Sequence, residues 1–97
     1  MKDWLANYKK TFGTDGNTQA IIGYNAVMTF AFYVEKAGKD LTGQKVLNSL
    51  ESGEKFYDIF SSPPTKFSKT DHLANTITQV QQVQKGRWVL VKDNLMF

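Results

Sequence analysis

The chain has 97 residues, a mass of 11.0 kDa and a formal net charge of +3, so it forms one domain or part of one and cannot enclose a cleft between two lobes of its own. Its composition, 41% hydrophobic and 22% charged, excludes a disordered chain. Cysteine is absent and His72 is the only histidine, which excludes disulfides and thiolate or histidine-rich metal sites, and we expect neither metal nor cofactor.

The first predicted helix covers residues 3–11. Four apolar side chains recur there at helical spacing and share one face: Trp4, Leu5, Tyr8 and Phe12. The turn Gly-Thr-Asp-Gly at residues 13–16 is expected to end this helix. Asn17 or Thr18 then caps the next helix, because a short polar side chain can accept a hydrogen bond from a free backbone N–H.

A long helix is predicted over residues 18–37, with Gly38 as its C-cap. Its apolar side chains lie on more than one side, which is typical of a helix buried between two layers. One face is marked by Ala20, Ile21, Tyr24, Val27, Met28, Ala31 and Val34, and Phe30, Phe32 and Tyr33 widen it. Gly23 in the interior costs about 1 kcal/mol relative to alanine, which favours close approach of another backbone at this point.

A shorter helix is predicted over residues 42–52, and Gly53 is expected to stop it. Four apolar side chains are expected to face inward: Leu41, Val46, Leu47 and Leu50. Glu51 and Glu54 at its end indicate a solvated face. Four residues that follow predict a compact aromatic patch, Phe56, Tyr57, Ile59 and Phe60. The prolines at 63 and 64 break regular structure, and residues 67–73 are typical of a loop.

The end of the chain predicts a β-hairpin. Residues 76–84 and 87–92 are rich in Val, Ile, Thr and Trp, and Lys85-Gly86 is suited to a two-residue turn. The first strand alternates poorly, since Ile77, Val80 and Val83 are three residues apart. Either a bulge resets the register or the strand is covered on both faces.

The charge pattern gives no sign of a nucleic-acid partner. The twelve Lys and Arg residues are scattered singly or in pairs, whereas nucleic-acid binders usually gather them on one helix or stripe. The longest weakly polar stretch, residues 20–34, is shorter than the roughly 20 apolar residues that a membrane span needs. The first residues, Met-Lys-Asp-Trp, lack the apolar run of a signal peptide.

Ser68, Asp71 and His72 offer a hydroxyl, a carboxylate and an imidazole within five residues. In a catalytic triad the fold normally brings these groups together from separate segments, and adjacent Asp and His side chains point in different directions. The favoured interpretation is a turn in which Asp71 makes a local backbone hydrogen bond. We therefore predict that the chain is not an enzyme, with no catalytic residue.

The order of several segments resembles the C-terminal part of the type I periplasmic solute-binding proteins, the branched-chain amino acid-binding family of ABC importers. The matching segments are 8–13 (Tyr-Lys-Lys-Thr-Phe-Gly), 23–26 (Gly-Tyr-Asn-Ala), 35–38 (Glu-Lys-Ala-Gly), 47–51 (Leu-Asn-Ser-Leu-Glu), 67–72 (Phe-Ser-Lys-Thr-Asp-His), 79–83 (Gln-Val-Gln-Gln-Val) and 85–89 (Lys-Gly-Arg-Trp-Val). Two features depart from the family pattern: Asn25 stands where many members carry Asp, and two prolines stand where many approach the strand through glycine.

In that family two α/β lobes close on a small polar ligand, and three strands cross the hinge between them. The resemblance implies an α/β fold that is one partial lobe, helices followed by a C-terminal β-hairpin. Within the single partial domain 1–97, residues 1–62 would belong to the first lobe and residues 67–97 would cross the hinge. The start of the long helix would face the ligand, which makes Thr18, Gln19 and Tyr24 candidate ligand-binding residues, since a helix N-terminus suits a carboxylate. For Tyr24 a packed core position is the favoured alternative.

The resemblance further implies an amino acid-like solute and ABC permease subunits as partners, and a periplasmic or extracytoplasmic location for the full-length protein. Family members are far longer than 97 residues, so we expect a C-terminal fragment whose long helix lacks its sheet and exposes aromatic area. Patches of that kind seldom stay open, which predicts self-association through this helix or the hairpin. The alternative is a free-standing small α+β interaction module with no ligand.

Overall fold

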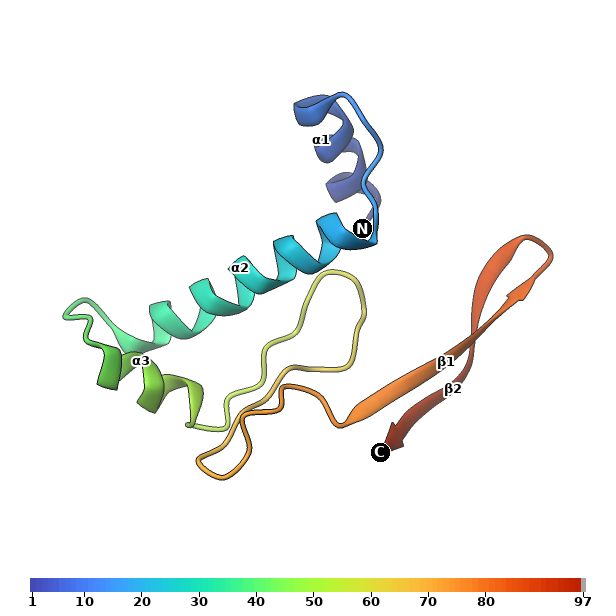
Figure 1. Cartoon of the computed structure of the whole chain (residues 1–97). Helices are drawn as coiled ribbons and strands as arrows, with labels where there is room; N and C mark the ends of the chain where they lie inside the picture. Colours follow the sequence, from blue (N-terminus) through green and yellow to red (C-terminus); the bar gives the residue numbers. More distant parts are fainter. Residues whose placement is uncertain (97) are drawn as a thin grey trace.

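The computed structural model describes residues 1–96. Three helices come first, α1 (Lys2–Phe12), α2 (Thr18–Ala37) and α3 (Gly43–Leu50), and an antiparallel hairpin of β1 (Ile77–Gln84) and β2 (Arg87–Met96) follows. Figure 1 shows α2 running across one half of the molecule and the hairpin projecting at the other. The predicted fold class, helices followed by a C-terminal hairpin, is confirmed. None of the described helices combines the length and the hydropathy that crossing a bilayer requires.

Local signals set the helix ends. The Asn17 side chain accepts a hydrogen bond from the Ala20 N–H at 2.9 Å, so Asn17 rather than Thr18 caps α2. Gly13 ends α1 with φ of 75°, a left-handed conformation that glycine adopts without steric cost. Thr42 caps α3 by accepting from the Lys45 N–H at 3.1 Å. The predicted bounds of the three helices therefore agree with the structure to within two residues.

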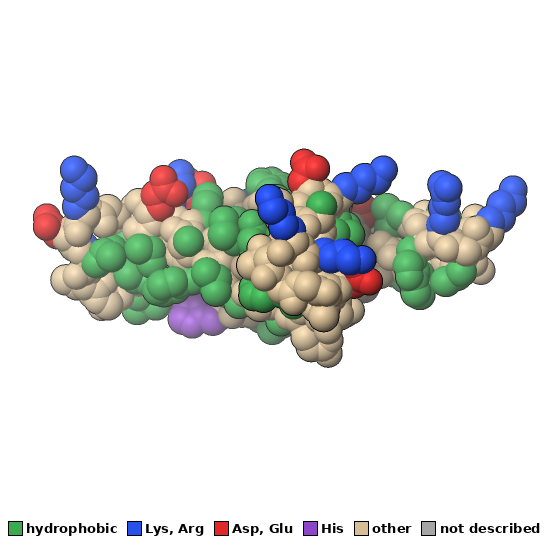
Figure 2. All heavy atoms as spheres, turned by 90° about the horizontal axis from the view of Figure 1, so that it is seen from above, with side chains coloured by type: hydrophobic (Ala, Val, Ile, Leu, Met, Phe, Trp, Pro, Cys, Tyr) green, Lys and Arg blue, Asp and Glu red, His purple; other side chains and the backbone are tan. Residues whose placement is uncertain are grey.

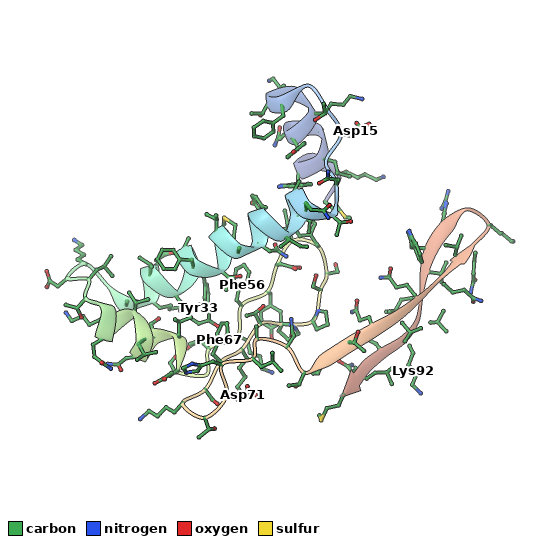
Figure 3. All side chains as sticks on the ribbon, viewed as in Figure 1. Asp15, Tyr33, Phe56, Phe67, Asp71 and Lys92 are labelled. Atoms are coloured by element: carbon green, nitrogen blue, oxygen red, sulfur yellow. The ribbon has the colours of Figure 1, made fainter. Side chains whose placement is uncertain are left out.

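The most buried part of the molecule lies where α2, α3 and the loop that follows them meet. Tyr33 of α2 has no exposed surface, and its hydroxyl donates a hydrogen bond to the Glu54 carbonyl at 2.7 Å. The Tyr33 ring lies edge-on to Phe67, with their centroids 5.8 Å apart (Figure 3). Ser49 of α3 donates from Oγ to the Tyr33 carbonyl at 2.7 Å. One tyrosine thus joins three segments.

A second aromatic cluster joins α1 to α2. The Trp4 ring packs edge-on against Tyr24 and Phe60, with centroid distances of 5.6 and 5.1 Å. A Cβ atom at Gly16 would lie 2.9 Å from the Trp4 ring, so a larger residue in this turn would displace that ring. The predicted compact patch at residues 56–60 is wrong, because Phe60 packs here while Phe56 packs against Phe32 of α2.

The hairpin turns at Lys85 and Gly86, whose φ angles of 51° and 75° are both in the left-handed region that a tight two-residue hairpin turn requires. Pairing is irregular between Thr78 and Val80 and again between Val80 and Gln81. At both places β2 uses one more residue than β1, so bulges reset the register and the alternative of a strand covered on both faces is wrong. β2 also runs to Met96, beyond the predicted end at residue 92, because pairing resumes past the bulges.

The chain is far more open than a compact domain of its size. Its radius of gyration is 16.0 Å, whereas a compact chain of this length has about 12.5 Å. Its accessible surface is 7644 Å², against about 5,600 Å² for a folded monomer of this mass. Several apolar side chains of α2 and the hairpin are mostly exposed, Phe30 at 61% and Trp88 at 72% among them.

Only part of the apolar face that the sequence predicts for α2 is covered in the structure. Ile21, Phe32 and Tyr33 face the rest of the chain, but Val27 and Phe30 are 66% and 61% exposed. The expected exposure of aromatic area on this helix is therefore observed. Of the side chains predicted to face inward around α3, Leu41 is 51% exposed, and Leu47 is 36% exposed although it lines a small hollow with Leu50, Phe67 and His72.

Candidate functional site

The N-terminus of α2 carries two of the predicted ligand-binding residues, Thr18 and Gln19, and both are exposed. Asn17 occupies two N–H groups of the first turn: its side chain accepts from Ala20, and its carbonyl accepts from Ile21 at 3.1 Å. The N–H groups of Thr18 and Gln19 precede the first intrahelical hydrogen bonds and point out of the helix end. An anion is favoured at such a position.

A groove between α1 and α2 lies beside this helix end. It measures about 540 Å³ and is lined by Trp4, Asn7, Tyr8, Thr11, Phe12, Ala20, Gly23 and Tyr24. The aromatic face of α1 supplies most of its wall, since Tyr8 contacts both Trp4 and Phe12, with centroid distances of 5.4 and 4.7 Å. Mostly apolar walls with a few amide and hydroxyl groups are typical of small-molecule sites.

The structure brings only one of the three predicted residues into this groove. Tyr24 lines it and is half-buried, and its ring also packs edge-on against Trp4 and Phe60. The packing expected of a core tyrosine is thus present, together with an open side toward the groove. Thr18 and Gln19 lie outside the groove lining. The ligand-binding role of all three stays a prediction.

A second, more polar cavity was not predicted from the sequence. It measures about 370 Å³ and is lined by Lys55, Pro64, Lys66, Phe67, Ser68, Asp71, Leu73, Ala74, Asn75, Thr76 and Ile77. Its walls meet because Phe56 and Thr65 exchange two backbone hydrogen bonds of 2.8 and 2.9 Å, and because the Lys66 N–H donates to the Ala74 carbonyl at 3.2 Å. No local sequence pattern predicts these backbone pairings, because they join two irregular segments.

The three residues of the catalytic hypothesis do not form a triad. The Asp71 carboxylate accepts from the Leu73 N–H at 2.8 Å, and the Asp71 N–H donates to the Ser68 Oγ at 3.1 Å. The predicted turn is therefore confirmed. The His72 Nε2 atom lies 3.0 Å from the Glu51 carboxylate, away from both Ser68 and Asp71. Within residues 1–96 no base is held against the Ser68 hydroxyl, which a serine nucleophile needs.

The Glu51 side chain is not where the sequence predicts it. Its side chain is only 15% exposed, because it packs under the loop that carries His72, so the prediction of a solvated face is wrong for this residue. The contact holds the end of α3 against residues 68–72. A partner 21 positions away cannot be identified from the spacing of the two glutamates alone.

Asn25, which departs from the family pattern, has a partner within the chain. Its Nδ2 donates to the Asp58 carboxylate at 2.8 Å. Burial by itself raises the pKa of Asp58, but hydrogen bonds from Ser62, Phe60 and Asn25 outweigh that effect and hold the pKa below its ordinary value. The Asn25 Oδ1 atom is buried without a protein partner among the described residues. An amide at position 25 can thus donate to an ionised Asp58, whereas an ionised carboxylate there would repel it.

Comparison with known proteins completes this description. The model of the family described as Periplasmic binding protein matches residues 1–87. No curated protein and no solved structure matches the chain significantly. Proteins of this family bind small-molecule solutes and are in general not enzymes. The match spans nearly the whole chain and agrees with the helices-then-hairpin architecture and with the resemblance drawn from its segments: the chain belongs to the type I periplasmic binding protein family.

Proposed function

We propose that this chain is the C-terminal part of a solute-binding protein that captures an amino acid or a similar small polar solute outside the cytoplasm and delivers it to the permease of an ABC importer. The observation that supports this most strongly is the family match over residues 1–87. The role is binding, and it assigns no catalytic step to any residue of the chain.

The roles that we propose for the two parts of the chain are based on the order of its helices and strands. Residues 1–62 hold the three helices and would contribute to the first lobe, and residues 67–97 hold the hairpin and would cross the hinge. The boundary between these two parts lies in the irregular segment between α3 and β1, and the hairpin projects away from α2 and α3 (Figure 1). Loop residues of this kind can absorb the changes in backbone angles that a hinge motion requires.

At the site, the free N–H groups of Thr18 and Gln19 would bind the carboxylate of the solute. The Tyr24 hydroxyl, five residues beyond Gln19 and so about one and a half turns further along α2, would bind its polar substituent at the edge of the groove between α1 and α2. The helix dipole supports this orientation, because negative charge is favoured at the N-terminal end of a 20-residue helix such as α2.

The test uses the gene product that carries this chain, screened by thermal shift against amino acids, their amides and aromatic acids. A solute present at about 100 times its Kd adds about 2.7 kcal/mol to the stability, which raises Tm by several degrees. Tyr24→Phe removes one hydroxyl and should weaken binding about 3- to 10-fold. Tyr57→Phe, at a side chain that is 67% exposed, is the matched control and should leave affinity unchanged.

Two results would contradict the proposal. If no amino acid-like solute raises Tm, the substrate class is wrong. If the 97-residue chain is itself the native product, folds alone and binds no small molecule, the free-standing interaction module becomes the better description.

A further inference from the structure

Asp58 lies outside the groove between α1 and α2, but it ties the loop after α3 to the helix that forms one wall of this groove. Its Oδ1 atom accepts hydrogen bonds from the backbone N–H groups of Phe60 and Ser62 at 2.9 and 3.1 Å. Its Oδ2 atom accepts from the Asn25 Nδ2 atom at 2.8 Å. One carboxylate therefore fixes the conformation of residues 58–62 and attaches them to α2.

The hydrogen bond between Asn25 and Asp58 is a polar contact on a helix whose side chains are mostly apolar. Between Thr18 and Val34 α2 has no charged residue, and Figure 2 shows hydrophobic side chains gathered along the part of the molecule that α2 crosses. Burial raises the pKa of Asp58, but its hydrogen bonds hold that pKa below its ordinary value, so the carboxylate is ionised at neutral pH. A part-buried charge with defined partners can specify one arrangement of the segments that it joins.

Phe60 connects this hydrogen-bonded loop to the groove. Its ring packs edge-on against Trp4 of α1 and Tyr24 of α2, with centroid distances of 5.1 and 6.0 Å. Trp4 and Tyr24 both line the groove, whereas Phe60 lies behind them, outside the lining. Within residues 1–96 ring contacts, and no hydrogen bond or ion pair, join α1 to α2. The position of α1 against α2, and so the width of the groove, therefore depends on this cluster of three rings.

We propose that Asp58 is a positioning residue for the solute groove. Through its hydrogen bonds to α2 and to its own loop, it holds the Phe60 ring against Trp4 and Tyr24. It thereby sets the width of the groove and the place of the Tyr24 hydroxyl. The inference rests on the proposed function, in which this groove binds the solute. Neither Asp58 nor Asn25 lines the groove, so both act through the rings, as supporting residues of a preorganised site do.

An exchange of the two polar groups tests this role. Asn25→Asp places a second carboxylate against Asp58, and the repulsion should drive the loop away from α2. Adding Asp58→Asn to Asn25→Asp restores the pair in reverse, since the new amide can donate to the carboxylate at position 25 while its oxygen still accepts from Phe60 and Ser62. Asn48→Asp is the matched control, because it adds the same charge at an exposed position of α3.

Fluorine NMR of the gene product that carries this chain, labelled with 5-fluorotryptophan, follows the position of the Trp4 ring. The resonance is assigned by its loss in Trp4→Phe, and that of Trp88, which is 72% exposed on the hairpin, is the internal reference. Asn25→Asp should move the Trp4 resonance toward the exposed value and leave the Trp88 resonance in place. The double variant should recover at least half of that shift, although one oxygen at position 25 stays buried without a partner. Asn48→Asp should match the wild type.

Solute affinity is the second measurement, made with the amino acid, amide or aromatic acid that raises Tm of the wild type most. Asn25→Asp should raise the Kd at least about 3-fold, as loss of the Tyr24 hydrogen bond would. The double variant should return the Kd toward the wild-type value, and Asn48→Asp should leave it unchanged. If Asn25→Asp does not fold, recovery of helix content by circular dichroism in the double variant supports the role of Asp58, and no recovery overturns it.

Three results would overturn the inference. An unchanged Trp4 resonance in Asn25→Asp would show that the pair does not hold the rings. A shift that Asp58→Asn does not reverse would show that the charge at position 25 acts without Asp58. An unchanged Kd despite a shifted Trp4 resonance would separate the rings from solute binding. If Trp4 responds as expected but no compound binds the wild type, the proposed function fails, while the role of Asp58 in positioning the groove is upheld.

Discussion

Tyr33 shows how a single side chain can hold this sparse structure together. Its ring is fully buried against Phe32 and Phe67. Its hydroxyl donates a hydrogen bond to the carbonyl of Glu54, a residue that lies outside the helices and strands. Burial first, and the nearby Glu54 carboxylate second, raise the pKa of this hydroxyl above its ordinary value. The neutral form is therefore the one that the folded state prefers.

Tyr33→Phe should destabilise the chain by about 1 kcal/mol, because it removes the hydrogen bond from the tyrosine hydroxyl to the Glu54 carbonyl. Urea unfolding at neutral pH measures this. A second consequence is a change in pH dependence: the unfolded tyrosine ionises near pH 10, below the folded one, so wild-type stability falls as pH rises from about 10 through the folded pKa. The variant should lack that component.

Tyr57→Phe provides the control, since Tyr57 is 67% exposed, and its free energy of unfolding should change by less than about 0.5 kcal/mol. Equal stability of the two variants would show that the Tyr33–Glu54 hydrogen bond contributes nothing. A pH dependence that survives in Tyr33→Phe would assign it to another group.

At the scale of single elements, the caps of α2 explain why its bounds are predictable. Asn17 and Gly38 mark its two ends in the sequence itself, and both act through contacts within four residues. The hairpin turn is predictable for the same reason, because a left-handed pair such as Lys85-Gly86 needs glycine in its second position. Local chemistry decides these features.

Asn17→Ala should cost about 1 kcal/mol, since it removes the side-chain acceptor for the Ala20 N–H. Thr18→Ala, one residue further on, removes no cap and should change stability by less than about 0.5 kcal/mol. Thermal unfolding followed by circular dichroism compares them. If the two variants lose equal stability, the assignment of the cap to Asn17 is wrong.

Features that depend on distant residues are not predictable in this way. Which side of α2 is covered is decided by α3 and by Glu54 and Phe67, more than 20 positions beyond the helix centre. The bulges of β2 depend on a register that neither strand encodes alone. For the candidate site, the position of Tyr24 in a groove follows from its contact with Trp4, while the pairing of His72 with Glu51 has no local signal.

At the scale of the whole molecule, the described parts of the helical region and the hairpin share no packed core. Residues 80–94 of the hairpin are all exposed, and its strands contact each other rather than the helices. A two-stranded hairpin is marginally stable on its own. The helical part, with its two aromatic clusters, thus carries most of the folding free energy.

Hydrogen exchange should separate these two parts. Amides of β1 and β2 should have protection close to zero, whereas those around Phe32 and Tyr33 in α2 should exchange with the free energy of global unfolding. Mass spectrometry of peptic fragments resolves the two regions. Equal protection in both would show that the hairpin is covered in solution, for example by strand pairing between copies.

The isolation of the hairpin turn has a practical consequence. Lys85 and Gly86 lie at the tip of a solvent-facing ribbon, with nothing within 4 Å of the Cβ position of Gly86. Loop tips of this kind accept inserted sequence without disturbing a distant core. An epitope or a fluorophore-labelling peptide placed between them would report on the position of the hairpin while leaving Tyr33 and the groove between α1 and α2 untouched.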